Sequence, residues 1–328
     1  MGFNFLRPSG AMALLALALV AGCREKVPAG SPPKVVRLGY FANLTHAQAV
    51  LGVESGDFAK AIAPVEFKTL VFNAGPSLME ALSAGEIDVG YVGPGPVLAS
   101  HGKSKGEAVR VISGAAANGV VIVARKDSGI KTLKDLAGRR IGTPQYGNTQ
   151  DIAARHYVTK VLGQKDHANV LAVPNAEQAA MMDRGDLDAA WVPEPWGARL
   201  VADVGATIVA EEKDLWDGGA FSLTLVVTTP EFAEAHPDII EKLLGVHRTW
   251  TERLNRDGPA QLPALGAALV KLTGKKLPPE VMSQAFSRVR FTNDALRPTF
   301  DAMGLWTYEL GLGQPYTRAQ TLFSLESK

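Results

Sequence analysis

The sequence predicts an α/β protein made of two lobes, each built on an open and mostly parallel β-sheet. A unit of strand, turn and helix recurs along the chain, and residues 84–96 align without a gap on residues 184–196. The stretches that open the two halves also correspond, since residues 37–45 resemble residues 140–149 apart from a slightly longer turn. Two matches in the same order indicate a repeated topology, where a single match could arise by chance.

Length and composition are consistent with this organisation. The chain has 328 residues, which is enough for two domains that each bury a core. Hydrophobic residues make up 46% and charged residues 20%, and the formal net charge is +1. The nearest approach to a basic run is Lys103-Ser104-Lys105 in a Gly-containing loop, so nucleic-acid binding is not expected.

The N-terminal segment has the pattern of an export signal. Arg7 provides a positive charge, and the apolar run over residues 11–21 is too short to span a bilayer. Val-Ala-Gly before Cys23 resembles the bacterial lipobox, in which the cysteine is lipidated and becomes the first residue of the mature protein. We therefore expect a signal peptide over residues 1–22, a lipid anchor at Cys23 and a tether over residues 23–33. The alternative is an ordinary secretory signal followed by a stray thiol, since Cys23 is the single cysteine and has no disulfide partner.

The first lobe is expected to begin with three strand–helix units. The strands are predicted at residues 35–41, 65–72 and 87–92, and the helices that follow them start near residues 43–45, 75–77 and 93–96. Ser77 and Glu80 have the spacing of a capping box, which predicts that the second of these helices starts at Ser77.

The second lobe is expected to contain the turn on which the binding hypothesis depends. A strand that begins at Arg140 runs into a turn set by Pro144 and Gly147, and Asn148 or Thr149 then opens a helix. Strands are also predicted near residues 109–114, 119–124 and 221–228, followed by mostly amphipathic helices from residue 231. Chain crossings near residues 123–125 and 220–223 would form a two-strand hinge, which gives lobe 1 as residues 34–123 and 221–328, and lobe 2 as residues 124–220.

Each strand–turn–helix junction is a candidate anion site. Free backbone N–H groups and the positive end of the helix dipole can hold a small anion without a cationic side chain. One such turn by itself is usually an ordinary βα connection, but facing lobes would bring several of them to one cleft at the carboxyl ends of the strands. Many neutral donors with few cations suit a small oxyanion.

The mature chain resembles the periplasmic binding proteins of nitrate, taurine and alkanesulfonate ABC transporters. The resemblance rests on Phe-Asn-Ala-Gly-Pro-Ser at residues 72–77, on residues 80–82 and 85–90, and on Trp-Val-Pro-Glu-Pro-Trp at residues 191–196. It is nearest to the aliphatic sulfonate receptors, although residues 40–46 do not match the corresponding stretch of sulfonate or taurine receptors. The resemblance implies a periplasmic binding protein type II fold, a small oxyanion as ligand and an ABC permease as partner. It also implies ligand contacts from residues 75–77, residues 147–149 and Trp196.

The loops and the resemblance together give the expected ligand-binding residues. They are Tyr40, Asn43, Thr45, His46, Gly75, Pro76, Ser77, Gly93, Pro94, Asn118, Tyr146, Gly147, Asn148, Thr149, Glu194 and Trp196. His46 could be a pH-responsive donor or a structural histidine. Glu194 could accept a hydrogen bond from a ligand amine or only stabilise a helix N-terminus, and Trp196 could be a cleft wall or a core residue. Asp88 and Asp188 occupy matched positions, so we expect a structural role common to both.

Two other functions stay open at this point, and so does a sensory role in which a signalling partner recognises the closed lobes. A receptor for a neutral heterocycle such as a thiamine precursor would use Tyr40, Tyr91 and Trp196 as stacking aromatics. A cytoplasmic enzyme of the same fold, resembling pyrimidine-precursor synthases of thiamine metabolism, is disfavoured by the lipobox and by the lack of a paired acid–base constellation. The other histidines lack metal-ligand spacing, so no metal or cofactor is expected, and we expect a monomer.

Overall fold

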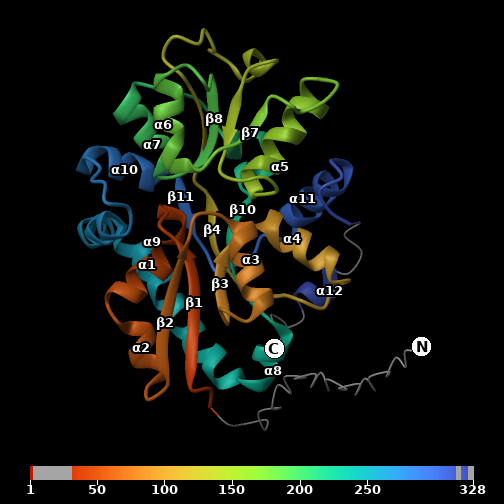
Figure 1. Cartoon of the computed structure of the whole chain (residues 1–328). Helices are drawn as coiled ribbons and strands as arrows, with labels where there is room; N and C mark the ends of the chain where they lie inside the picture. The colour runs from red at the N-terminus through yellow and green to blue at the C-terminus, as the bar shows by residue number, and fades with distance from the viewer. Residues whose placement is uncertain (3–31, 315–318, 324–328) are drawn as a thin grey trace.

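Two mixed β-sheets, one in each lobe, form the framework of the molecule (Figure 1). The computed structural model describes residues 1–2, 32–314 and 319–323. Nearly all of the expected signal peptide, the Cys23 anchor and most of the tether therefore lie outside the described residues.

The first sheet has six strands in the order β11-β4-β10-β3-β1-β2. They are β1 (Val35–Phe41), β2 (Glu66–Phe72), β3 (Val89–Val92), β4 (Arg110–Asn118), β10 (Ser222–Thr228) and β11 (Val289–Phe291). β1 pairs in parallel with β2 and β3, while β10 runs antiparallel to both β3 and β4. β1 to β4 therefore share one direction, and their carboxyl ends meet at the edge that faces the second lobe.

The second sheet has five strands in the order β7-β6-β8-β5-β9. They are β5 (Val120–Ala124), β6 (Ile141–Thr143), β7 (Val170–Ala172), β8 (Ala189–Pro193) and β9 (Thr207–Glu211). β6 pairs in parallel with β7 and β8, and β5 runs antiparallel to β8 and β9. The expected mostly parallel direction holds here for every strand except β5.

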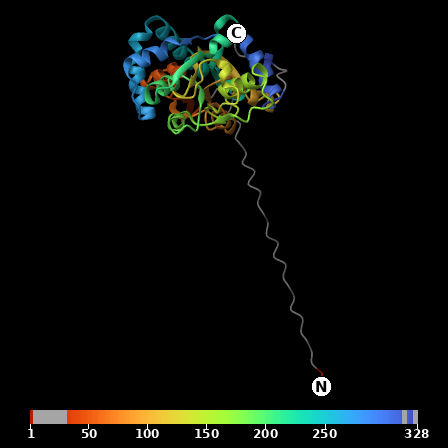
Figure 2. The same ribbon diagram turned by 90° about the horizontal axis from the view of Figure 1, so that it is seen from above.

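Helices surround both sheets. They are α1 (Ala47–Glu54), α2 (Asp57–Ile62), α3 (Gly75–Ala84), α4 (Pro94–Lys103), α5 (Thr149–His156), α6 (Asn175–Asp183), α7 (Trp196–Val204), α8 (Pro230–Ala235), α9 (Pro237–Thr273), α10 (Pro279–Ser287), α11 (Arg297–Glu309) and α12 (Ala319–Leu322), with short turns η1 (Leu44–His46), η2 (Leu133–Leu136), η3 (Tyr157–Val161), η4 (Glu212–Leu215) and η5 (Asp217–Gly219). Seen from above, the C-terminal helices lie at opposite ends of the body, α9 and α10 at one end and α11 at the other (Figure 2). Within the described residues, no helix has the length and apolar character needed to cross a membrane.

The repeat that the sequence predicts is confirmed by an arginine–aspartate contact that occurs at matched positions in the two lobes. In the first lobe Asp88 accepts hydrogen bonds from the backbone N–H and the Nε of Arg37, at 2.7 and 3.2 Å. In the second lobe Asp188 accepts the same two bonds from Arg140, at 3.0 and 3.1 Å. Burial opposes ionisation of Asp188, but the hydrogen bonds from Arg140 and Arg125 outweigh it and hold its pKa at about 2. The expected common structural role of the two aspartates is therefore correct.

The hinge lies slightly earlier in the chain than expected. β4 ends at Asn118 in the first sheet and β5 begins at Val120 in the second, so the first crossing is at Gly119. The expected boundary between residues 123 and 124 is wrong because β5 pairs with β8 and β9. The return crossing falls between η5 and β10, as expected near residues 220–223.

The predicted start of α3 is also corrected. The helix begins at Gly75 with Ala74 as its N-cap, and no side chain caps it. Ser77 lies inside the first turn, where its hydroxyl donates to the Ala74 carbonyl at 3.0 Å. The earlier start is compatible with Pro76 in the first turn, because N–H groups in the first turn of a helix have no intrahelical acceptor and proline lacks only that group.

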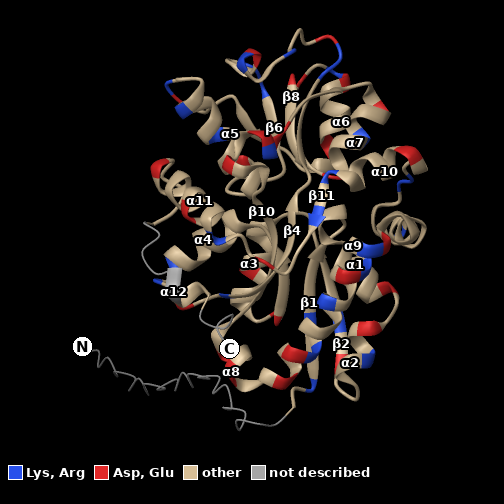
Figure 3. Cartoon of the chain, turned by 180° about the vertical axis from the view of Figure 1, so that it is seen from behind, with Lys and Arg blue, Asp and Glu red and all other residues tan. Residues whose placement is uncertain are grey.

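Charge is distributed without segregation between the lobes. Lys, Arg, Asp and Glu are interspersed over the outer helices and loops of both lobes (Figure 3). Strands such as β3, β5 and β8 are fully buried, and the largest fully buried side chains include Trp191, Tyr91, Phe58, Phe221 and Phe300. On the side that Figure 3 shows, the described residues form no basic face of the kind that binds nucleic acid.

Candidate ligand-binding site

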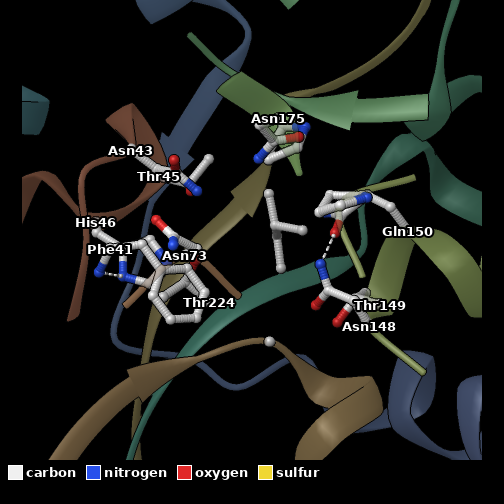
Figure 4. A pocket seen from close by; sticks show the side chains of 14 residues that line it. Phe41, Asn43, Thr45, His46, Asn73, Asn148, Thr149, Gln150, Asn175 and Thr224 are labelled. Atoms are coloured by element: carbon white, nitrogen blue, oxygen red, sulfur yellow. Dashed lines mark hydrogen bonds between the residues drawn. The ribbon is translucent and has the colours of Figure 1, made fainter. Parts of the chain in front are cut away.

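A cavity between the two lobes is the candidate site (Figure 4). The space in the cavity that no atom fills is about 330 Å³, open solvent included. Its lining residues come from the carboxyl ends of strands and from the loops after them. They are Phe41, Asn43, Thr45, His46, Asn73, Gly93, Pro144, Asn148, Thr149, Gln150, Asn175, Pro193, Leu223 and Thr224.

The lining contains polar side chains but no Lys, Arg, Asp or Glu. In Figure 4, the residues from β1 and η1 lie across the cavity from Asn148, Thr149 and Gln150, with Asn175 at its upper edge. The donors available to a ligand are amides, hydroxyls and backbone N–H groups. A lining with many hydrogen-bond donors and no charged side chain suits an oxyanion or a neutral polar molecule.

His46 is held neutral in this site. It is 2% exposed, and its Nδ1 accepts a hydrogen bond from the Phe41 N–H at 3.3 Å. Burial lowers its pKa to about 3, so the ring carries no charge near neutral pH. With Nδ1 as acceptor, Nε2 is the protonated nitrogen. The expected pH response of His46 near neutrality is therefore not supported, and the ring is a neutral donor.

Two helices start at the cavity wall. α4 begins after Gly93 and α5 begins after Asn148, and both of these N-cap residues line the cavity. The first turn of α5 has N–H groups without intrahelical partners. In α4, Pro94 and Pro96 have no N–H, and the Gly95 N–H already donates to Thr149 Oγ1. Asn148 itself donates to Gln150 Oε1 at 3.0 Å, which fixes the amide in the wall.

Two lining side chains have unsatisfied polar atoms. Thr224 Oγ1 and Asn175 Oδ1 are buried and have no hydrogen-bond partner among the described residues. Thr224 is 1% exposed and belongs to β10, in the first sheet, whereas Asn175 begins α6 in the second lobe. Because unpaired buried polar groups are costly, a ligand that accepts from the Thr224 hydroxyl and donates to Asn175 Oδ1 would be stabilised by contacts from both lobes.

The lobes are in direct contact beside the cavity. The Gly95 N–H donates to Thr149 Oγ1 at 3.2 Å, and the Leu44 N–H donates to the Glu194 carbonyl at 3.1 Å. A Cβ placed on Gly93 would collide with Thr149 Oγ1, so a glycine permits this close approach. The structure therefore has the lobes closed on the cavity.

Six of the expected ligand-binding residues line the cavity and ten do not. Those that line it are Asn43, Thr45, His46, Gly93, Asn148 and Thr149. Those that do not are Tyr40, Gly75, Pro76, Ser77, Pro94, Asn118, Tyr146, Gly147, Glu194 and Trp196.

Local geometry explains the first-lobe differences. Tyr40 is 3% exposed and packs in the core, because neighbours on a strand point to opposite faces and Phe41 takes the cavity side. Gly75 is packed against Pro96, where a Cβ would collide with the proline ring. Residues 75–77 form the first turn of α3, and Asn73 just before it reaches the cavity instead.

The differences in the hinge and the second-lobe turn have equally local causes. Asn118 has a positive φ of 63° and accepts a hydrogen bond from the Phe221 N–H at 3.2 Å, so it ties the two crossings together. Tyr146 is 56% exposed, and Cζ of Arg155 lies 4.8 Å above the centre of its ring. The Gly147 N–H donates to Asp151 Oδ2 at 2.9 Å and is not free for a ligand.

Glu194 is a buried structural carboxylate. It is fully buried, accepts from Arg288 Nη1 at 2.9 Å and from the Ala198 N–H at 3.0 Å. Burial raises its pKa, against the opposing effect of these two donors. Of the two expected roles, Glu194 therefore has the structural one at the N-terminus of α7, because both of its carboxylate oxygens already accept hydrogen bonds from the protein.

Sequence reasoning missed eight lining residues. They are Phe41, Asn73, Pro144, Gln150, Asn175, Pro193, Leu223 and Thr224. Asn73 and Asn175 could have been found, since each is an Asn at or just before the start of a helix that follows a strand. Leu223 and Thr224 lie inside β10, and no local signal distinguishes them from core strand residues.

A cavity closed between two hinged α/β lobes defines a two-lobed solute-binding protein. The chain belongs to the NMT1-like family, whose model matches residues 29–264. Among the described residues, no group of three or more His, Cys, Asp or Glu side chains is placed to hold a metal ion.

Relatives of known name agree with this class. A protein of Bacillus subtilis (strain 168), provisionally named an aliphatic sulfonates-binding protein, is 29% identical over 238 residues, which span 70% of this chain and 68% of the relative. The taurine-binding periplasmic protein of Escherichia coli (strain K12) is 29% identical over 203 residues, 61% of this chain and 58% of the relative.

Solved structures share the fold. The alkanesulfonate-binding protein SsuA from Xanthomonas axonopodis pv. citri, bound to MOPS, has a TM-score of 0.69 at 22% identity and covers 86% of this chain and 95% of its own. The periplasmic aliphatic sulphonate-binding protein SsuA from Escherichia coli has a TM-score of 0.70 at 21% identity, and the match covers 89% of this chain and 98% of the SsuA chain. The predicted two-lobed fold of periplasmic binding proteins is therefore confirmed.

Proposed function

We propose that this chain is the solute-binding receptor of an ABC importer. It captures a small oxyanion such as an alkanesulfonate, taurine or nitrate in the interlobe cavity and delivers it to the permease. The observation that carries this proposal is the cavity lining, which offers the N-terminus of α5 and neutral donors from both lobes and no ionised side chain. The names of the relatives support the same ligand class.

A neutral heterocycle is the weaker candidate. The expected aromatic sandwich of Tyr40, Tyr91 and Trp196 does not form around the cavity, because none of the three lines it. Phe41 is the lining aromatic on the first-lobe side, and its ring is 4.4 Å from that of His46. One flat wall gives less stacking area than two.

Export and anchoring complete the proposal. A signal peptide over residues 1–22 and lipidation of Cys23 would hold the monomeric receptor at a membrane, facing the periplasm or the cell exterior, through the tether at residues 23–33. The periplasmic relatives support export. We propose no enzymatic activity, since the polar groups at the cavity are amides and hydroxyls with one neutral histidine.

Ligand-induced thermal stabilisation tests the proposal. The full chain with Cys23→Ser would be melted with taurine, ethanesulfonate, nitrate, bicarbonate and a hydroxymethylpyrimidine. A ligand at about one hundred times its dissociation constant stabilises by roughly 2.7 kcal/mol, which raises the melting temperature visibly.

A matched pair of variants locates the response. Asn175→Ala removes a cavity amide, whereas Asn169→Ala removes an amide that bonds to the Arg139 carbonyl outside the cavity. We expect an oxyanion response that Asn175→Ala weakens and Asn169→Ala retains. A response to the pyrimidine alone would overturn the oxyanion assignment, and silence toward every compound would overturn the receptor proposal for these ligand classes.

A further inference from the structure

Helix α7 of the second lobe lies beside α10, and α9 lies next to α10 (Figure 1). A second cavity is lined by residues from this region. It contains about 1030 Å³ of empty space, part of it open to solvent, and shares no lining residue with the interlobe cavity. Pro195 and Arg199 come from the second lobe, and the other lining residues come from α9, α10 and the loop between them. Pro195 belongs to the motif at residues 191–196, but the proposed receptor function does not use this space.

The wall of this second cavity is mainly apolar. Leu262, Leu269, Val270, Leu277 and Met282 contribute aliphatic and thioether surface. A space of this size lined by such side chains favours an alkyl chain, because moving methylene groups out of water is favourable and roughly proportional to the area removed. Met282 can adapt its shape to an irregular occupant.

The charged lining residues all have the same sign. Arg199, Lys275 and Lys276 line the cavity, and no Asp or Glu does. Arg199 is 5% exposed, and its Nη2 donates to Thr273 Oγ1 and to the Lys275 carbonyl, at 3.3 and 2.9 Å. Its Nε is buried and has no hydrogen-bond partner among the described residues.

The environment of Arg199 favours an added anion. Burial lowers the pKa of its guanidinium, and the Asp203 carboxylate on the same helix opposes that shift. In the part of the chain that the structure describes, however, no carboxylate forms an ion pair with Arg199, whose guanidinium lies over the Trp196 ring at 5.4 Å. A buried cation with an unused donor is stabilised when an anionic group comes within hydrogen-bond distance.

We propose that this cavity is a second binding site, which takes a free single-chain amphiphile with an alkyl tail and one anionic head group. The aliphatic wall holds the tail, and Arg199 with Lys275 and Lys276 selects the sign of the head group. The two cavities are separate, so this site stands whether or not the interlobe cavity binds an oxyanion.

Calorimetric titration with decanoate tests the site. The full chain would carry Cys23→Ser, so that no acyl chain on the protein competes for the cavity. Acetate supplies the head group without the tail, and decyltrimethylammonium supplies the tail with the opposite charge. We expect decanoate to bind at a molar ratio of one, with neither acetate nor decyltrimethylammonium binding comparably.

Paired glycine substitutions on α9 locate the binding. Gly266 lines the cavity, and a Cβ there would stand 3.5 Å from the Met282 methyl group, so Gly266→Leu fills the space. Gly245 on the same helix is outside the cavity, which makes Gly245→Leu the control. We expect Gly266→Leu to weaken decanoate binding by at least about tenfold, and Gly245→Leu to leave it unchanged.

The charge requirement has its own variants. Lys275→Gln/Lys276→Gln alters two exposed side chains and should weaken decanoate binding without affecting folding, and Arg199→Gln should weaken it further. Thr149→Ala in the interlobe cavity should not change it. Equal binding of decanoate to the Gly266→Leu and Gly245→Leu variants, or equal binding of decanoate and decyltrimethylammonium, would overturn the proposal. Association with phosphatidylglycerol vesicles in place of free decanoate would also overturn it.

Discussion

The indole Nε1 of Trp196, in the second lobe, donates a hydrogen bond to Asn43 Oδ1, in the first lobe, at 2.8 Å. Trp196 does not line the interlobe cavity, whereas Asn43 does. The tryptophan therefore acts on the ligand site through Asn43: it holds one lining amide in place and joins the two lobes beside the cavity. The ligand contact that the family resemblance implies for Trp196 is replaced by this contact between lobes.

Trp196→Phe should weaken closure without unfolding either lobe. The substitution keeps an aromatic ring but removes one interlobe hydrogen bond, which contributes about 0.5–1.5 kcal/mol. If closure is linked to binding, ligand affinity should fall by roughly two- to tenfold. Calorimetry would measure the affinity, and small-angle scattering would measure the radius of gyration of the free protein.

Trp250→Phe is the control for that substitution. Trp250 Nε1 donates to Asp57 Oδ2 at 3.1 Å within the first lobe, so the same kind of bond is lost away from the lobe contact. Its affinity should match that of the parent chain. An equal loss of affinity in both variants would show that the Trp196 effect is general destabilisation and not closure.

Thr224→Val should stabilise the unliganded protein and reduce its response to ligand. The Thr224 hydroxyl is buried in the cavity wall without a partner, and removing such a group recovers a desolvation cost of about 1 kcal/mol. A ligand that bonds to this hydroxyl would lose that contact. Urea unfolding with and without ligand measures both effects.

Thr228→Val, on the same strand, should have the opposite effect on stability. The Thr228 hydroxyl donates to the Asp88 carbonyl at 2.7 Å, so its loss leaves a buried carbonyl with one bond fewer. We expect destabilisation by roughly 1 kcal/mol and an unchanged ligand response. Destabilisation by Thr224→Val of similar size would contradict the assignment of the Thr224 hydroxyl as an unpaired ligand contact.

Glu212 should make stability fall as the pH rises toward neutrality. It is 1% exposed, and burial raises its pKa to about 7, against the opposing hydrogen bonds from the Trp191 and Trp216 indoles. The folded protein then keeps a proton that the unfolded chain loses above about pH 4.5. The stability from this group is fully present below about pH 4.5 and is lost as the pH rises to about 7, a change of roughly 3 kcal/mol.

Urea unfolding at pH 5 and pH 8 checks the sign for Glu212. The free energy of unfolding of the parent chain, relative to that of Glu212→Gln, should be lower at pH 8 than at pH 5. The exposed Glu80→Gln substitution should show no such difference. A difference of the opposite sign would mean that the indole donors dominate and that the carboxylate form is the stabilised one.

The repeated topology could be predicted from the sequence because it depends on local patterns. Gly85-Glu86-Ile87-Asp88 and its counterpart at residues 185–188 each connect a helix to a strand. The aspartate in each pairs with an arginine, Arg37 within β1 and Arg140 immediately before β6. Strand periodicity, glycine C-caps and matched spacing are properties of short segments, so they are visible without the fold. The family membership followed from the same motifs.

The position of individual side chains could not be predicted in the same way. Tyr40 and Phe41 are adjacent aromatics on one strand, and only the packing of β1 against the core decides which of them faces the cavity. Ser77 was expected to cap α3, but the helix starts at Gly75 and turns the serine away from the site. Thr224 lies in β10 and approaches Asn175 of the second lobe only because the chain returns through the hinge.

The sequence by itself therefore determined two α/β lobes, the strand–helix units that open each of them, and some of the loops that line the cavity, such as residues 43–46 and 148–149. Only the tertiary structure decided that Leu223 and Thr224 line the cavity, that Glu194 is bonded to Arg288, and that Trp196 joins the lobes. The physical reason is the distance along the chain over which each feature is determined. Turns and helix caps depend on residues that are neighbours in the sequence. The cavity depends on contacts between residues more than a hundred positions apart, such as Asn43 and Trp196.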